Sequence, residues 1–251
     1  MHLEEFAEGT SLFHRLDPRV KIVTLLPYII VIAVMHGITL PALAFFVSAI
    51  LILITRIDMK KLLSRLAVVN IFILLLWLFL PFSYPGIKVF SIGPLTATQE
   101  GFLYALSITL KANAIVLATI AVLGTSEVFS LAHALVHLKV PNKLVYLFFF
   151  FYRYITVLHD EYSTLKRAIK IRAFRPGTTM HTYKTYAYLV GMLIVKSYDR
   201  SQRIYSAMLC RGFTGKFPII MHFHTHVRDY VFSFIMLSIT IIMVALSYSG
   251  R

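Results

Sequence analysis

The 251-residue sequence is poor in acidic residues and has a single cysteine. Only 11 Asp and Glu stand against 25 Lys and Arg, and charged residues make up 14% of the chain. With Cys210 alone, no disulfide can form within the chain. The acidic opening MHLEEFAEG also lacks a basic stretch followed by an apolar core, so we expect no cleavable signal peptide.

Apolar residues are what the sequence has in abundance, at 58% of the chain with a mean hydropathy of +0.76. That composition is too apolar for a soluble domain, and the chain is too long for a single membrane anchor. A formal charge of +14 suits nucleic acid, but in a membrane protein it typically marks cytoplasmic loops and anionic headgroups. We therefore predict a protein of the cell (inner or plasma) membrane that contacts the lipid bilayer and no nucleic acid.

Several windows are apolar over nearly the length that a membrane-spanning helix needs, which is roughly 20 residues. The sequence therefore predicts an all-α, multi-pass membrane protein with about five transmembrane helices. The predicted spans cover residues 20–35, 40–54, 66–81, 102–123 and 230–248.

Lys and Arg fall unevenly between the predicted loops. The turn HGITLP has none, and the loop FSYPGIKVFSIGPLTATQEG has only Lys88. The positive-inside rule therefore places the N-terminus in the cytoplasm and Arg251 outside, which an odd number of spans allows. The residues on the predicted inner side are Arg15, Arg19 and Lys21, then Arg56, Lys60, Lys61 and Arg65, and finally those from Lys139 to Arg228.

Two long amphipathic helices are predicted between the fourth and fifth spans. In the first, over residues 141–175, apolar residues recur at steps of three and four. The second covers about 183–211, with Lys196, Arg200 and Arg203 on a different face from its apolar stripe. The predicted stripes are Leu147, Phe151, Tyr154, Leu158, Tyr162, Leu165 and Ile169, and then Ala187, Gly191, Ile194, Tyr198, Ser201, Tyr205 and Met208.

Because Ala187 and Gly191 are small, the second stripe is expected to let another helix approach closely. Its continuously apolar part is too short to span a bilayer, so we place this helix in the interface or the cytoplasm. The predicted organisation is thus a four-span region at 1–125, a cytoplasmic pair of long helices within 126–228, and a C-terminal transmembrane helix at 229–251.

The two long helices end alike, in IRAFRPG and CRGFTG. Ordinary capping explains each end taken singly, since Gly212 and Gly215 supply positive φ and Arg complements the helix dipole. Two copies at the ends of two exposed basic helices instead indicate insertion into acidic grooves of a partner, because the guanidinium offers a fixed fork of donors.

Other motifs carry less weight. HFHTH, with His222, His224 and His226, resembles a metal trap, as do His133 and His137 one helical turn apart, but interfacial histidines are the commoner explanation. We therefore expect no metal ligand here.

GFTGKF is no phosphate-binding loop, since Phe217 replaces the Ser or Thr that holds magnesium. With no catalytic residues evident, we predict no enzyme. Lys111 lies inside a span and is expected to contact a neighbouring helix or subunit.

The stretch RSQRIYSAMLCRGFTG resembles the signature of the transmembrane T component of energy-coupling factor (ECF) importers, especially the Q subunit of cobalt and nickel systems. SLFHRLDPRVKIV resembles that family's N-terminal motif, and FSIGPLTATQEGFLYALSITLKA its third-to-fourth span region. VPNKLVYLFFFFYRYITVLHDEYSTLKRAIKIRAFRP resembles its first long coupling helix. The likeness covers nearly the whole chain in the expected order.

The resemblance implies a scaffold whose two coupling helices insert arginine-bearing ends into grooves of two ATP-binding subunits. Cargo then binds to a separate membrane subunit, and ATP and Mg bind to the partners, with no cofactor in this chain. The family's Ala-Arg-Gly-like motifs map onto Ile171-Arg172-Ala173 and Cys210-Arg211-Gly212. Ala173 resists positive φ, so the first helix is less suited to the usual left-handed cap. The implied coupling residues are Ile171, Arg172, Ala173, Phe174, Arg175, Cys210, Arg211, Gly212 and Phe213.

The leading hypothesis is a coupling subunit that passes ATP-driven movement of partner ATPases to the cargo-binding subunit, for cobalt or nickel uptake. A vitamin importer, such as one for biotin, is the alternative within the same family. A self-sufficient secondary transporter or channel is the rival from a different class; Lys111 and the histidines favour it, and the lack of polar or broken helices at mid-membrane disfavours it.

Overall fold

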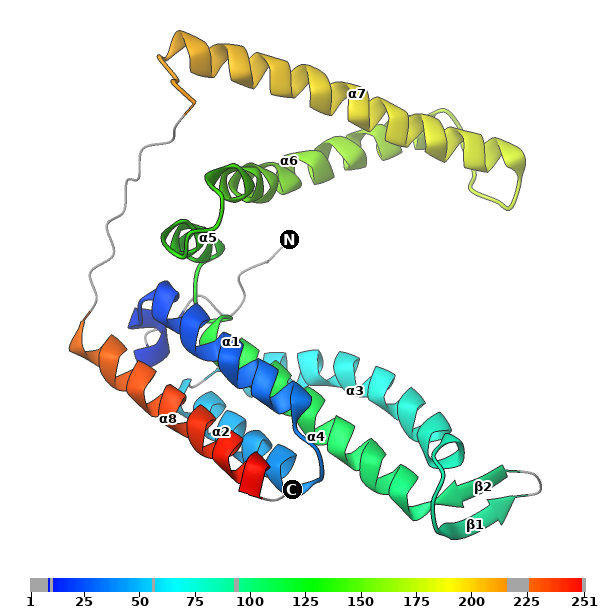
Figure 1. Cartoon of the computed structure of the whole chain (residues 1–251). Coiled ribbons are helices and arrows are strands. Elements are labelled where there is room, and N and C mark those ends of the chain that lie inside the picture. The colour runs from blue at the N-terminus through cyan, green and yellow to red at the C-terminus, as the bar shows by residue number, and fades with distance from the viewer. Residues whose placement is uncertain (1–8, 10, 56, 93–94, 216–225, 250–251) are drawn as a thin grey trace. The chain divides into compact units, whose positions relative to one another are not determined.

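A computed structural model of the chain describes residues 9, 11–55, 57–92, 95–215 and 226–249. This part of the chain contains eight α-helices, one short 3-10 helix and a two-stranded antiparallel ribbon (Figure 1). The prediction of an all-α membrane protein is confirmed, and the ribbon lies in a stretch that was predicted as loop. The elements are η1 (Leu12–Arg15), α1 (Pro18–Val34), α2 (Thr39–Thr55), α3 (Met59–Ser83), β1 (Lys88–Ile92), β2 (Leu95–Thr98), α4 (Gln99–Val122), α5 (Val128–His137), α6 (Asn142–Ile171), α7 (Met180–Cys210) and α8 (Val227–Ser249).

The chain divides into two compact units, each described here by itself. The bundle unit comprises residues 2–139 and 223–251, with η1, α1–α5, the ribbon and α8. The helix-pair unit comprises residues 140–222, with α6 and α7. Both α5 and α8 belong to the bundle unit. The predicted division at 125 and 228 stays a prediction.

Within the described residues, α3, α4 and α8 are the helices long and apolar enough to cross a membrane. Each remaining predicted span also lies on a single helix, α1 or α2. Both of these have 17 residues, which is shorter than a full crossing needs. The number of spans therefore stays a prediction.

Polar side chains fix where the bundle helices begin. The Asp17 carboxylate accepts a hydrogen bond from the Arg19 backbone N–H (2.9 Å), with Pro18 at the first helical position of α1. Asp58 caps α3 in the same way, and Thr98 Oγ1 accepts from the Gly101 N–H (3.2 Å) to cap α4. These caps satisfy N–H groups that the helices leave without internal partners.

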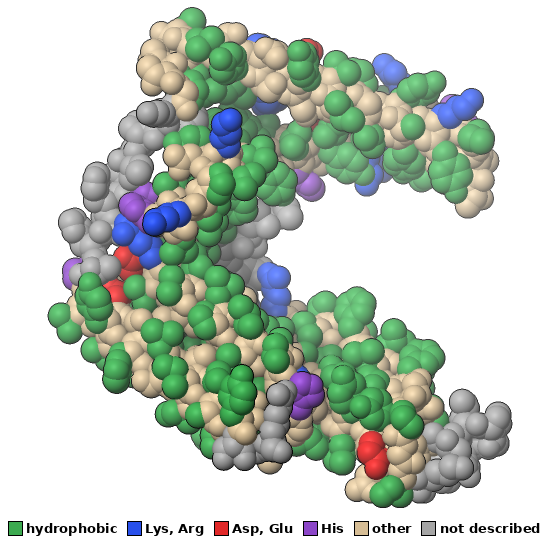
Figure 2. All heavy atoms as spheres, viewed as in Figure 1, with side chains coloured by type: hydrophobic (Ala, Val, Ile, Leu, Met, Phe, Trp, Pro, Cys, Tyr) green, Lys and Arg blue, Asp and Glu red, His purple; other side chains and the backbone are tan. Residues whose placement is uncertain are grey.

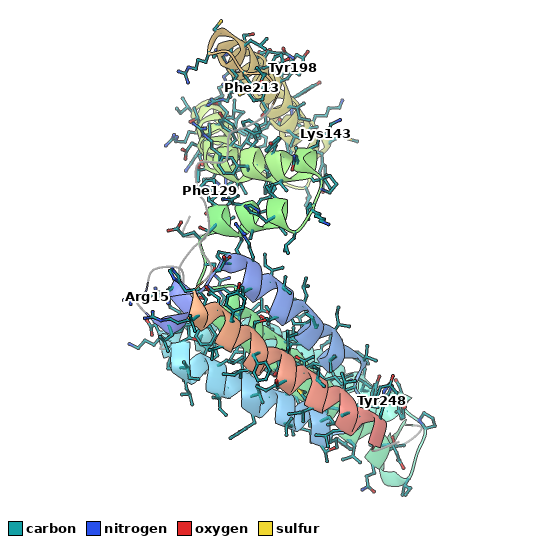
Figure 3. All side chains as sticks on the ribbon, turned by 60° about the vertical axis from the view of Figure 1, so that its left-hand side comes forward. Arg15, Phe129, Lys143, Tyr198, Phe213 and Tyr248 are labelled. Carbon is teal, nitrogen blue, oxygen red and sulfur yellow. The ribbon has the colours of Figure 1, made fainter. Side chains whose placement is uncertain are left out.

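The core of the bundle is built on α4, which packs against α2, α3 and α1, while α8 packs against α1. Figures 1 and 3 show these helices side by side, with Arg15 and Tyr248 at opposite ends of the bundle. Small buried residues on α4, such as Ala114 and Ala118, let neighbouring helices approach closely. Tyr28 is fully buried, and its hydroxyl donates to the Ala44 carbonyl (3.0 Å), which holds α1 on α2.

A polar pair joins α3 to α4 in the apolar bundle. The side-chain amides of Asn70 and Asn113 donate to one another's carbonyl oxygens at 3.1 and 3.0 Å. Trp77 Nε1 also donates to Thr109 Oγ1 (2.9 Å). Because lipid offers no competing partners, such pairs fix how one helix sits against another.

The outer surface of the bundle is apolar. Ile71, Phe72 and Leu74 on α3 are each about two-thirds exposed or more, at 68%, 70% and 72%. Figure 2 shows hydrophobic side chains over most of the bundle surface on the face in view. A surface of this kind is stable when it faces lipid, which agrees with a membrane protein.

Candidate functional site

The C-terminal end of α6 closes in a left-handed cap. The Ala173 N–H donates to the Lys170 carbonyl (3.1 Å), and the Phe174 N–H reaches back to the Ile169 carbonyl (3.3 Å). These two bonds form a Schellman motif, with Arg172 as the C-cap residue and Ala173 at φ 60°. An alanine at positive φ costs roughly 1–2 kcal/mol relative to the right-handed region, so the cap holds against a local preference.

The end of α7 repeats this geometry. The Gly212 N–H donates to the Leu209 carbonyl (2.9 Å) and the Phe213 N–H to the Met208 carbonyl (3.0 Å), with Gly212 at φ 78°. The expectation that Ala173 would make the first end depart from this cap was wrong. The paired backbone bonds outweigh the alanine's resistance to positive φ.

The two C-cap arginines have nearly the same backbone conformation. Arg172 has φ −78° and ψ 24°, and Arg211 has φ −90° and ψ 10°. Both side chains are exposed, and neither guanidinium makes an ion pair or hydrogen bond with the residues that the structure describes. Each helix thus ends in an arginine that the described residues leave without a partner, and the paired backbone bonds of the cap hold its main chain.

The residues around the two arginines differ more. Phe174 is half-buried, and its ring packs on His181 (centroids 6.1 Å apart) and edge-to-face on Tyr186 (5.9 Å). It therefore secures the α6–α7 connection within its own chain, although the resemblance had grouped it with the coupling residues. Of the other implied coupling residues, Ile171 is 85% exposed, Phe213 is half-buried, and Arg175 and Cys210 are exposed.

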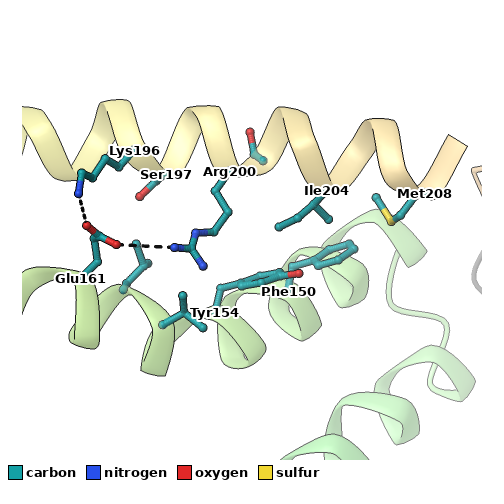
Figure 4. Close-up of a pocket in the computed structure, with 11 residues that line it drawn as sticks. Phe150, Tyr154, Glu161, Lys196, Ser197, Arg200, Ile204 and Met208 are labelled. Carbon is teal, nitrogen blue, oxygen red and sulfur yellow. Dashed lines mark hydrogen bonds and ion pairs between the residues drawn. The ribbon is translucent and has the colours of Figure 1, made fainter. Parts of the chain in front are cut away.

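One acidic residue ties the two long helices where they cross. The Glu161 carboxylate on α6 accepts a hydrogen bond from the Lys196 ammonium and lies 3.6 Å from the Arg200 guanidinium, both on α7 (Figure 4). The hydrogen bond from Lys196, helped by both positive charges, holds the pKa of the Glu161 carboxyl below its ordinary value. Sequence reasoning missed this role, although Glu161 lies about one turn after Leu158, directly before Tyr162 of the predicted stripe.

An apolar groove of about 260 Å³ continues from this ion pair along the two helices. Figure 4 shows Phe150 and Tyr154 of α6 lying opposite Ile204 and Met208 of α7. Since Glu161 meets Lys196 while Phe150 meets Met208, the helices run antiparallel. Within α6 and α7, only Val145, Thr182 and Leu189 are buried.

Only part of the predicted α7 stripe faces α6. Ser201 and Met208 of that stripe line the groove, together with Lys196, Arg200 and Ile204 from outside it. Ile194 and Tyr198 of the predicted stripe are instead 64% and 63% exposed. The prediction chose the α7 face from the apolarity and small size of its residues. In the structure, Lys196 and Arg200 are directed at α6 because the Glu161 carboxylate pairs with both cations.

The ion pair also sets where the arginines lie. Arg172 follows Glu161 by eleven residues, and Arg211 follows Arg200 by eleven. At 1.5 Å per residue, each arginine lies about 16 Å along its own helix from the crossing, in opposite directions. The structure therefore separates the two arginines instead of gathering them into one site.

Lys111, inside a predicted span, contacts a neighbouring helix. Its ammonium donates to the backbone carbonyls of Met35 and Ala33 (3.4 Å to Ala33), at the C-terminal end of α1. These carbonyls lack partners within α1, so the cation complements the negative end of that helix.

The histidines are only partly described. His222 and His224 lie outside the described residues, and the His226 backbone N–H donates to Asp229 Oδ2 (2.7 Å). His133 and His137 lie on α5 with ring centroids 5.2 Å apart. Over the described part of the chain, no group of three or more His, Cys, Asp or Glu residues has the arrangement of a metal site.

An apolar helical bundle, with an antiparallel pair of long helices that each end in an exposed arginine, defines a helical membrane protein. A family model described as CbiQ, cobalt transport protein, matches residues 9–223, and the chain belongs to this family.

Several curated proteins are similar in sequence to this chain over most of their length. The energy-coupling factor transporter transmembrane protein EcfT of Bacillus subtilis is 25% identical over 226 residues, covering 86% of this chain and 85% of the relative. EcfT 1 of Listeria monocytogenes is 25% identical over 269 residues, covering 98% of both. An uncharacterised protein of Methanocaldococcus jannaschii is 25% identical over 247 residues, covering 96% of this chain and 85% of the relative.

Proposed function

We propose that the chain is the transmembrane coupling (T) subunit of an ECF-type importer in the cell membrane. In this role it passes ATP-driven movement of two partner ATPases to a separate substrate-binding membrane subunit. The observation that carries the proposal is the pair of exposed arginines, each the C-cap of a long helix in the same Schellman motif. The names of the EcfT relatives support it.

The mechanism is mechanical. Each arginine enters an acidic groove on one ATPase, where its planar fork pairs with a carboxylate. The pair of helices, tied at Glu161, moves as the grooves close together on ATP binding. Because the two arginines lie in opposite directions from the crossing, one chain engages two ATPases at once.

The proposed cargo is cobalt or nickel ion. The family description names cobalt transport, and the EcfT names state no cargo. Biotin or another vitamin is the alternative, since the cargo-binding subunit is a separate chain. Uptake of Co²⁺, Ni²⁺ and biotin by cells that make the complete complex separates these cargoes.

Co-purification is the direct test. The tagged chain, expressed with its partners, should retain the ATP-binding subunits and show ATPase activity only as a complex. A chain that transports cargo in cells lacking those subunits contradicts the proposal and favours a secondary transporter or channel. The contact of Lys111 with the end of α1 gives this residue a role that needs no ion pathway.

Orientation is tested separately. Topology reporters at Lys61 and Lys170 should lie in the cytoplasm, and those at Lys88 and Arg251 outside. An external position for Lys170 contradicts the proposal, because the arginine ends then face away from cytoplasmic ATPases.

A further inference from the structure

Three ionisable side chains are almost wholly buried in the bundle unit. Lys21 is 0% exposed, Asp229 2% and Asp17 6%. Charged residues are rarely buried to this degree unless they are paired, because removing a charge from water is unfavourable. The sequence offered no sign of this, since Lys21 was counted with the exposed basic residues that flank the first span.

Asp229 joins the starts of two helices. Its Oδ1 accepts from the Asp17 backbone N–H (2.9 Å), and its Oδ2 accepts from the His226 backbone N–H (2.7 Å). Asp17 is the N-cap of α1, and His226 immediately precedes α8. One carboxylate therefore satisfies free N–H groups at the beginning of α1 and of α8.

Lys21, one turn after Asp17 on α1, holds a third segment. Its ammonium donates to Thr125 Oγ1 (3.2 Å) and Ser126 Oγ (2.5 Å), in the short connection between α4 and α5. Both hydroxyl residues are themselves buried. We call Asp17, Lys21, Thr125, Ser126 and Asp229 the junction cluster.

The junction cluster lies where the chain passes from α4 toward α5 and where α8 begins. Thr125 and Ser126 lead from α4 into α5, the last helix of the bundle unit before α6 and α7, and His226 precedes α8, the first bundle helix after them. The first turn of α1 thus binds the segment that leads into α5 and the start of α8. An aromatic contact reinforces it, since Phe13 in η1 packs edge-to-face on Phe232 of α8 (5.4 Å).

The junction cluster is not arranged for stability alone. Among the described residues, Asp17 Oδ2 is buried without a hydrogen-bond partner, which is unfavourable. Apolar residues of similar volume often stabilise such sites better than buried charges do, whereas charges with directional bonds define one geometry.

We propose that the junction cluster is the point at which movement of the α6–α7 pair is passed to the bundle. With the segment before α5 and the start of α8 both held on α1, a displacement that reaches α5 or α8 shifts α1 as well; without this hold, α5 and α8 move independently of α1. Lys21 and Asp229 are positioning residues in this scheme, which rests on the proposed coupling function.

The test uses the complete complex with Lys21→Met and Asp229→Asn, and with Lys61→Met as a control at an exposed lysine. We expect both junction variants to lower uptake of the transported ion about tenfold, a typical size for coupling between sites. Retention of the ATP-binding subunits should match the parent, and Lys61→Met should leave uptake unchanged. If Lys21→Met does not reach the membrane, the double variant Lys21→Met/Asp229→Asn takes its place in the experiment, because it removes one charge of each sign.

A distance measurement separates coupling from simple loss of fold. In a Cys210→Ser background, spin labels at the exposed positions 188 on α7 and 74 on α3 report on the pair relative to the bundle. Labels at 74 and 234, on α3 and α8, report on the bundle alone. We expect Lys21→Met to broaden only the first distance distribution.

Two outcomes overturn the inference: uptake by Lys21→Met within twofold of the parent, or broadening of the 74–234 distribution together with the 188–74 distribution. Failure of the coupling function itself looks different. In that case the parent chain does not retain the ATP-binding subunits, whatever residue is present at position 21.

Discussion

The ends of α6 and α7 have the same hydrogen-bond pattern and the same C-cap residue type, but one uses Ala173 and the other Gly212 at positive φ. Glycine adopts this conformation freely, whereas alanine resists it. Their agreement teaches that the cap geometry does not follow from the left-handed residue alone. The paired bonds to the preceding turn define it, and the arginine is held alike at both ends.

Of the changes at these two helix ends, reversing the charge of the arginine should have the largest effect on retention of the ATP-binding subunits. Arg211→Glu and Arg172→Glu each place a carboxylate in a groove that we propose is acidic, so repulsion is added to the lost pairing. We expect loss of the ATP-binding subunits from the tagged chain in both variants. If either variant retains the ATP-binding subunits at the level of the parent, the helix end that carries the substitution does not bind them.

Truncation should be milder and similar at both ends. Removing an arginine that pairs with a buried carboxylate costs about 2–5 kcal/mol, against well under 1 kcal/mol for a solvated cap. An alanine unsuited to the cap would predict a milder effect at Arg172, but Ala173 adopts the same cap geometry as Gly212. Arg172→Ala and Arg211→Ala should therefore lower subunit retention and uptake to a similar extent.

Lysine at the same positions is the matched control, because it keeps the charge but not the fork of donors. Arg172→Lys and Arg211→Lys should restore part of the loss. If the double variant Arg172→Ala/Arg211→Ala retains its ATPases and transports normally, both arginines are only helix caps.

Substituting the residue with positive φ at each helix end should have a smaller effect, which is on the stability of the folded chain. Gly212→Ala should destabilise the α7 end by about 1 kcal/mol, and Ala173→Gly should stabilise the α6 end by a similar or smaller amount. Thermal unfolding in detergent measures both, with Gly177→Ala as a control at a glycine without positive φ. Equal shifts of the same sign contradict the assignment of strain to Ala173.

The smallest effect should come from Glu161→Gln, since the ion pair is partly exposed. The pKa of Glu161 is lowered in the folded chain, so its stabilisation is complete above the ordinary value of 4.5 and is lost as pH falls through the folded value. Thermal unfolding in detergent should show a slightly lower Tm for Glu161→Gln than for the parent at pH 7. Parent and variant should converge as the pH falls through the folded pKa of Glu161; a difference that persists at still lower pH contradicts the role of the charge.

Much of the helical fold could be predicted from sequence, because apolar runs and periodicity are local signals. Each predicted helix corresponds to an observed one, with ends that differ by one to seven residues; the largest difference is at the start of α3, predicted at 66 and observed at Met59. The arginine ends were also visible, as repeated short motifs. The ribbon at 88–98 was missed because its strands are short and lie in a polar loop.

What could not be predicted depends on partners distant in sequence. The face of α7 that packs on α6 is decided by Glu161, 35 residues before Lys196. Lys21 looked like a flanking cation because the residues that bury it are more than 100 positions away. Periodicity describes one helix at a time, so it gives no information on either pairing.

The equal spacing of Arg172 and Arg211 from the Glu161–Arg200 pair gives the helix pair an approximate twofold axis through the crossing. The axis exchanges the C-terminal end of α6 with that of α7, caps and arginines included. A single chain can then match two copies of one ATPase arranged about their own twofold axis, each offering the same groove. The exchange fails only where the chain continues, since α6 leads into α7 whereas α7 leads back to the bundle. If the two partners close symmetrically, as the proposed function requires, this difference between the ends converts their closure into a displacement with one direction.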